Sequence, residues 1–143
     1  MLSYLLANIV ISFWLFDYCL DSDIRGKYYH VVTPYIESRI EVCLNDSKEN
    51  IKFYVLHELW HFFRYEFISE EEKKFYEFLF NWSNNLDFYR EYGKSSAEED
   101  FADNFALAID SFSLENKINS RVLKLKINFI KHLLIKYEKT YKN

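Results

Sequence analysis

His57-Glu58-Leu59-Trp60-His61 determines how the rest of the chain is interpreted, because its spacing suits a helix that carries a metal site. Residues four positions apart lie on the same face of an α-helix, so His57 and His61 can direct their ring nitrogens at one point. Glu58 is rotated by about 100° from His57, which lets its carboxylate reach a metal-bound water without becoming a ligand. The pattern therefore predicts two zinc ligands and a general base.

The same residues also fit a buried helix without metal, in which one histidine is hydrogen-bonded in the core and the other is exposed. The apolar neighbours that such a helix would bury are Val55, Leu56, Leu59, Phe62 and Phe63. A catalytic zinc normally has three protein ligands and an open position for water. A third ligand elsewhere in the chain is therefore what separates the two interpretations.

The composition favours one mostly helical domain. A chain of 143 residues, half of them hydrophobic, is large enough to bury a core, and we expect a single domain spanning residues 1–143. Two glycines and one proline leave few helix breakers. The net charge of -4 gives no broad basic surface, so we expect no nucleic-acid partner. The lysines near the end are predicted to lie on a solvated helix face: Lys124, Lys126, Lys131, Lys136, Lys139 and Lys142.

The apolar stretch Leu2–Leu20 is close in length to a membrane span. Polar residues such as Asn8 and Asp17 interrupt it and it has no small-residue cleavage site, so we interpret it as core rather than as a signal peptide or anchor. We therefore expect a cytoplasmic location without a membrane partner. We also expect a monomer. Cys19 and Cys43 lack metal-ligand spacing and are expected to be reduced thiols.

Two periodicities organise the rest of the chain. Residues 24–44 alternate like a β-hairpin with one buried face and a turn at Thr33-Pro34-Tyr35. Helical spacing and capping signals predict helices that begin near Ser47, Ser69, Ser96 and Ser120. The first of these carries the motif and ends near Phe67, and the third ends near Phe112. The expected fold class is α+β, mostly helical.

Carboxylates that could complete the metal site lie in the helix that begins near Ala97. The candidates are Glu98, Glu99, Asp100 and Asp103. Glu99 and Asp103 share one helix face, so one can ligate zinc while the other accepts the ring N–H of a ligand histidine. The alternative is a solvated acidic helix start, which the helix dipole favours.

The segment from Tyr92 to Phe105 reads YGKSSAEEDFADNF, and it resembles the third-ligand segment of gluzincin zinc metallopeptidases. It is most similar to that of the anthrax lethal factor catalytic domain family, in which a tyrosine and a glycine precede a helix with the pattern Glu-x-Phe-Ala-acidic-x-Phe. The resemblance covers about two thirds of the chain. It implies that Glu99 is the third zinc ligand, that Asp103 orients a ligand histidine, and that Tyr92 stabilises the oxyanion.

The resemblance further implies a zincin-like metallopeptidase fold of the small size seen in minigluzincins, with a β-hairpin or sheet packed on the motif helix. Residues 39–44 would offer a strand edge to an extended peptide or protein substrate. Two residues depart from the family pattern. Trp60 stands where a small residue is usual, and Asp103 replaces the more usual glutamate.

We therefore expect a zinc-dependent endopeptidase that hydrolyses peptide bonds through a zinc-bound water, with Glu58 as general base. One alternative is a regulatory peptidase dedicated to one protein, or a precursor that its own basic tail beyond Tyr137 inhibits. The other alternative is a non-catalytic zinc-binding domain. The intact Glu58 argues against this last alternative, because a structural zinc needs ligands but no base.

Overall fold

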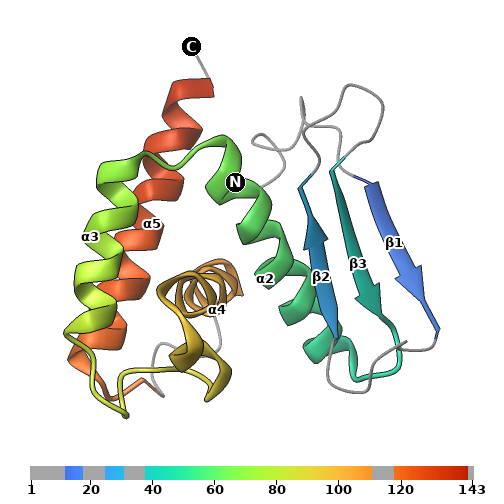
Figure 1. Cartoon of the computed structure of the whole chain (residues 1–143), viewed down its shortest axis with the longest axis horizontal. Coiled ribbons are helices and arrows are strands. Elements are labelled where there is room, and N and C mark those ends of the chain that lie inside the picture. Colours follow the sequence, from blue (N-terminus) through green and yellow to red (C-terminus); the bar gives the residue numbers. More distant parts are fainter. Residues whose placement is uncertain (1–11, 18–24, 31–37, 111–117, 142–143) are drawn as a thin grey trace.

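Figure 1 shows the computed structural model of the chain, which describes residues 12–17, 25–30, 38–110 and 118–141. A small sheet lies on one side of helix α2, and the other helices lie on its opposite side. The strands are β1 (Ser12–Phe16), β2 (Gly26–Tyr29) and β3 (Arg39–Cys43). The helices are α2 (Lys48–Glu66), α3 (Glu70–Asn81), the short 3-10 helix η1 (Tyr92–Ser95), α4 (Ala97–Asp110) and α5 (Arg121–Tyr141). The architecture is α+β and mostly helical, as predicted.

β3 is the central strand of the sheet, parallel to β1 and antiparallel to β2. The pairing of Gly26 with Val42 confirms the predicted hairpin, whose turn lies outside the described residues. Because β3 is hydrogen-bonded on both sides, the expectation that residues 39–44 offer a strand edge is wrong. The strand edge next to α2 belongs to β2 instead, and Gly26 lies against the α2 residue Glu58.

At Trp14 and Leu15 of strand β1, the interpretation of Leu2–Leu20 as core is wrong. The five residues of β1 pair in parallel with β3 and form the outer strand of the sheet. Trp14 and Leu15 are 50% and 58% exposed, so this part of the stretch lies at the surface. Residues 2–11 and 18–20 lie outside the described ranges.

One face of the sheet packs on α2 through a small apolar cluster. Ile40 and Val42 of β3 are buried together with Leu59 and Phe62 of α2. Removing such side chains from water is the main driving force for this contact. Since Leu59 and Phe62 stand beside the motif histidines, the sheet fixes which way the rest of α2 faces. The predicted packing of a sheet on the motif helix is confirmed.

Serine caps determine where the helices begin. Ser69 and Glu72 form the predicted capping box of α3, with N···O distances of 2.9 and 3.3 Å. The hydroxyl of Ser96 accepts a hydrogen bond from the backbone N–H of Glu99 over 3.2 Å. This cap places Glu99 in the first turn of α4, with its backbone held in position.

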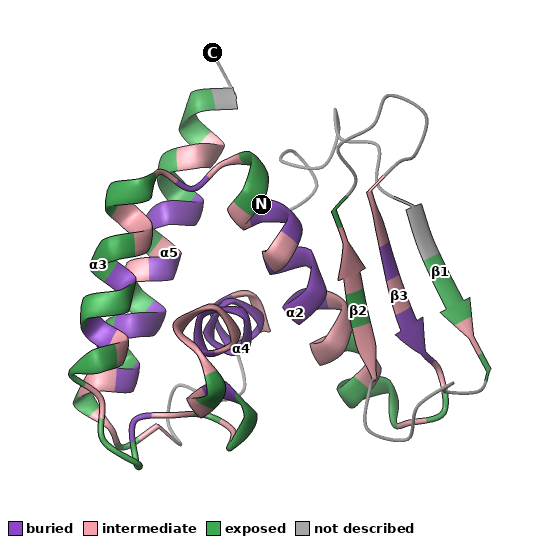
Figure 2. Ribbon diagram, in the orientation of Figure 1, coloured by how far each residue is buried: buried purple, intermediate pink, exposed green. Residues whose placement is uncertain are grey.

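The other face of α2 packs on α4, which is buried along most of its length (Figure 2). Trp60 is buried, and its ring stacks on that of Phe101 with centres 3.6 Å apart and planes 6° apart. Phe105 of α4 extends the same contact at 5.5 Å between ring centres. The bulk of Trp60 is therefore accommodated by the stack that joins α2 to α4.

A buried ion pair joins α4 to α5. Lys126 Nζ lies 2.8 Å from Asp100 Oδ2, and neither side chain has exposed surface. The hydroxyl of Tyr76 donates to the same oxygen over 2.9 Å, and the Asn104 amide donates to Asp100 Oδ1 over 3.1 Å. The prediction that Lys126 lies on a solvated face is therefore wrong.

Replacing Lys126 with Met is expected to lower the free energy of unfolding by about 3–5 kcal/mol, because Asp100 then keeps a buried charge without its cation. Urea denaturation of the zinc-free protein measures the change. Lys124→Met is the matched control, since Lys124 is exposed on the same helix; its effect should stay within about 0.5 kcal/mol. Equal urea midpoints for the two variants would contradict this role of Lys126.

Cys43 is disulfide-bonded, so the expectation of a reduced thiol is wrong for this residue. Disulfides persist mainly in oxidising compartments. The disulfide at Cys43 therefore argues against the cytoplasmic location, which stays a prediction. Among the described residues, no helix combines the length and the apolar character that crossing a membrane requires.

Candidate metal centre

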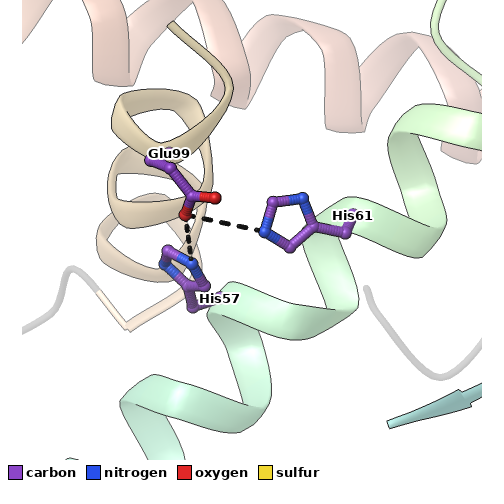
Figure 3. Close-up of side chains that lie close together, drawn as sticks. All are labelled: His57, His61 and Glu99. Atoms are coloured by element: carbon purple, nitrogen blue, oxygen red, sulfur yellow. Dashed lines mark hydrogen bonds and ion pairs between the residues drawn. The ribbon is translucent and has the colours of Figure 1, made fainter. Parts of the chain in front are cut away.

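His57 and His61 project from α2 toward α4, where the carboxylate of Glu99 meets both rings (Figure 3). Glu99 Oε2 lies 3.0 Å from His57 Nε2 and 3.7 Å from His61 Nε2. One ligand atom from each of the three residues lies within 4.8 Å of the others. Within the described ranges, this is the group of histidine and carboxylate side chains placed to hold a metal ion.

The three residues fit zinc by donor type and by spacing. Two imidazoles and one carboxylate are the donor set of a common class of catalytic zinc site. Tetrahedral ligands at 2.0–2.1 Å from zinc lie about 3.3 Å from one another. The observed separations of 3.0 and 3.7 Å lie on either side of that value. The two distances to Glu99 therefore fit a zinc site, and all three ligand atoms lie within 4.8 Å of one another.

Each histidine is held through its other ring nitrogen by a separate carboxylate of α4. His57 Nδ1 lies 2.9 Å from Asp103 Oδ1, and His61 Nδ1 lies 3.2 Å from Glu98 Oε1. Such contacts fix the ring orientation and leave Nε2 for a metal. The predicted role of Asp103 agrees with this contact. The role of Glu98 was missed, because the sequence placed it only among the possible ligands.

The side chain of Asp103 is shorter than that of a glutamate, and residues of the preceding loop lie close to its carboxylate. Arg90 donates from Nε to Asp103 Oδ2 over 3.0 Å and from Nη2 to Asp103 Oδ1. A Cβ atom added to Gly93 would lie 3.3 Å from Asp103 Oδ2, so a larger residue would crowd the carboxylate. Arg90 was not predicted, since nothing in its local sequence marks it as part of the site.

Glu58 is buried between α2 and strand β2. A Cβ atom added to Gly26 would lie 2.9 Å from both Cγ and Oε1 of Glu58, so only glycine lets the strand approach this closely. Burial raises the pKa of Glu58 above its ordinary value, while the charges of His57 and His61 oppose the rise. The carboxylate is therefore a stronger base than an exposed glutamate.

A cleft of about 410 Å³ opens over these side chains. Its lining residues are Arg25, Gly26, Tyr54, His57, Glu58, His61, Arg90, Tyr92 and Glu99. Tyr92 is 56% exposed, with its ring centre 6.1 Å from that of His57. Partial burial, followed by the charges of Glu99 and Glu58, raises the pKa of Tyr92, so the phenol keeps its proton at neutral pH.

The two histidines that have no motif around them lie away from the centre. His30 is exposed at the end of β2 and stacks on Tyr65, with ring centres 4.2 Å apart. His132 is exposed on α5. The structure therefore agrees with their interpretation as surface or structural residues.

In the zinc-free protein, the pKa values of His61 and Glu99 are shifted in opposite directions. Burial alone would lower the pKa of His61, but hydrogen bonds to Glu98 and Glu99 outweigh it and raise the pKa to about 9. Burial alone would raise the pKa of Glu99, but hydrogen bonds to His57 and His61 outweigh it and lower the pKa to about 2. The metal-free site is therefore an imidazolium beside a carboxylate.

The stability of the zinc-free protein should depend on pH accordingly. The contribution of protonated His61 to the free energy of unfolding is complete below the ordinary histidine pKa of 6.5. It is lost as the pH rises through about 9. The Glu99 contribution is complete above its ordinary pKa of 4.5 and is lost as the pH falls through about 2. Urea midpoints should therefore be highest between these two ordinary values. A midpoint that rises from about pH 6 to about pH 9.5 would contradict the assignment, and His61→Gln should flatten the alkaline decline.

Comparisons with family models, with curated proteins and with solved structures return no match for this chain. A functional proposal therefore depends on the side-chain geometry and on the chemistry that these residues can perform.

Proposed function

We propose that this chain is a zinc-dependent endopeptidase of the gluzincin type, with a zincin-like fold. The observation that carries the proposal is the meeting of His57 Nε2 and His61 Nε2 at one oxygen of Glu99, beside a buried Glu58. His57, His61 and Glu99 would hold the zinc. When bound, zinc supplies a Lewis acid that polarises the scissile carbonyl and activates water at neutral pH.

Glu58 and Tyr92 supply the proton chemistry. Glu58 takes the proton that the attacking water loses and passes it to the amine as the C–N bond breaks. Its raised pKa favours this role, and it lines the same cleft as the histidines. Tyr92 keeps its phenolic proton and can donate a hydrogen bond to the oxyanion that forms when the carbonyl is attacked.

The position of β2 as an outer strand of the described sheet supports an extended peptide or protein as the substrate. This strand borders the cleft at Gly26, next to Glu58. A peptide that adds to an exposed strand edge is held by main-chain hydrogen bonds, which suit many sequences. We propose that the substrate lies along β2, in place of the β3 edge expected from the sequence.

Cleavage of an unbiased peptide pool tests the proposal. Zinc-loaded protein should cut the pool, a chelator should stop the cutting, and added zinc should restore it, with the cut sites mapped by mass spectrometry. Cutting that persists after chelation would contradict a zinc mechanism. If the zinc-loaded protein cuts nothing, the non-catalytic zinc-binding domain becomes the better account.

A further inference from the structure

Arg90 lies between α3 and η1, and its guanidinium contacts the carboxylate that supports His57. Its Nε donates to Asp103 Oδ2 over 3.0 Å, and its Nη2 donates to Asp103 Oδ1. Asp103 Oδ1 also lies 2.9 Å from His57 Nδ1. Because Arg90 bonds to both oxygens, the carboxylate cannot turn without breaking one of these bonds.

Burial makes Asp103 dependent on this partner. Asp103 has no exposed surface, and taking a carboxylate out of water is costly unless a cation and hydrogen bonds compensate it. Among the described lysines and arginines, Arg90 is the side chain that forms an ion pair with Asp103. The state in which Asp103 is charged and oriented toward His57 therefore depends on Arg90.

Aromatic rings lie close to the Arg90 guanidinium. The Arg90 Cζ lies 4.4 Å from the ring centre of Phe53 on α2 and 5.9 Å from the ring centre of Tyr92. A cation at such distances from an aromatic ring is attracted by the ring electrons. One side chain thus connects α2, the carboxylate on α4 and the residue proposed to bind the oxyanion.

We propose that Arg90 is a positioning residue of the metal centre, which holds Asp103 so that His57 directs Nε2 toward the point it shares with His61 and Glu99. The inference rests on the proposed function, because it requires His57 to be a metal ligand. A lysine cannot take over this role fully, since an ammonium lacks the rigid planar fork with which two guanidinium nitrogens each bond to one carboxylate oxygen.

Zinc affinity, measured by competition with a coloured chelator, tests the proposal. Arg90→Met should bind zinc about 10- to 100-fold more weakly than the parent, as expected when a ligand histidine loses its orienting support. Arg90→Lys should recover part of that loss. The visible spectrum of the cobalt-loaded protein should change in Arg90→Met, because the ligand field depends on where the coordinating nitrogen of His57 lies. Arg121→Met is the matched control, since Arg121 is an exposed arginine at the start of α5.

The possible outcomes separate this inference from the proposed function. A parent that binds no zinc overturns the proposed function, and the inference falls with it. A parent that binds zinc, with Arg90→Met equal to it in affinity and in cobalt spectrum, overturns the inference alone. If near-ultraviolet circular dichroism shows that Arg90→Met is unfolded, Arg90→Lys decides: affinity equal to that of the parent overturns the inference, and weaker binding by a folded protein supports it.

Discussion

Glu58→Gln should slow peptide hydrolysis by about 10²- to 10⁴-fold, the range that loss of a general base usually costs, and should still bind zinc. The amide keeps the size of the side chain, so the close approach of Gly26 is preserved. It cannot accept the proton of the attacking water. The rate is measured on a peptide found to be cut in the pool, and zinc is measured in the same samples.

Glu71→Gln is the control for this substitution, because Glu71 is exposed on α3, outside the cleft. It should cleave at the rate of the parent. If Glu58→Gln also cleaves at that rate, Glu58 is not the base. If Glu58→Gln loses zinc, its role is to hold the centre together, and the proton chemistry proposed above is wrong.

Glu99→Ala should weaken zinc binding by more than the roughly 10- to 100-fold that loss of an orienting partner costs, because it removes a ligand itself. Glu98→Ala provides the comparison on the adjacent position. Glu98 contacts His61 at Nδ1, the nitrogen that faces away from Glu99, and also pairs with Arg64, so its loss should fall within that smaller range. The two neighbouring carboxylates should therefore differ clearly in a chelator competition assay.

Equal losses from these two variants would show that Glu99 is no more a ligand than Glu98. A larger loss from Glu98→Ala would reverse the two roles. Glu77→Ala on the exposed side of α3 should change nothing in the same assay, which controls for the general loss of negative charge.

Local signals predicted most of the helical structure. Capping serines and helical spacing are properties of a few neighbouring residues, so the starts near Ser69 and Ser96 could be located without tertiary information. The position of β1 could not be predicted from neighbouring residues in this way. Its parallel pairing with β3 joins segments separated in sequence, and its apolar residues Trp14 and Leu15 are exposed, against the usual meaning of such a run.

The residues of the candidate metal centre also fall into those that a local pattern predicts and those that it does not. The histidine spacing and the turn of helix at Glu99 are local patterns, and their meeting agrees with the predicted ligand set. Arg90 and Lys126 carry no local signal, because a cation becomes a buried partner only through its tertiary position. For this reason the local sequence predicts a solvated face for all the lysines near the end, and for Lys126 the prediction is wrong.

Zinc stoichiometry at equilibrium decides whether His57 belongs to a metal centre. The parent and His57→Ala are dialysed against the same zinc-buffered solution, and bound metal is measured by elemental analysis with circular dichroism as the check on folding. The proposed centre predicts one tightly bound zinc per chain in the parent and a large loss of it in a folded His57→Ala. A parent that takes up no stoichiometric zinc, or a His57→Ala variant that keeps it, would contradict the assignment of this centre.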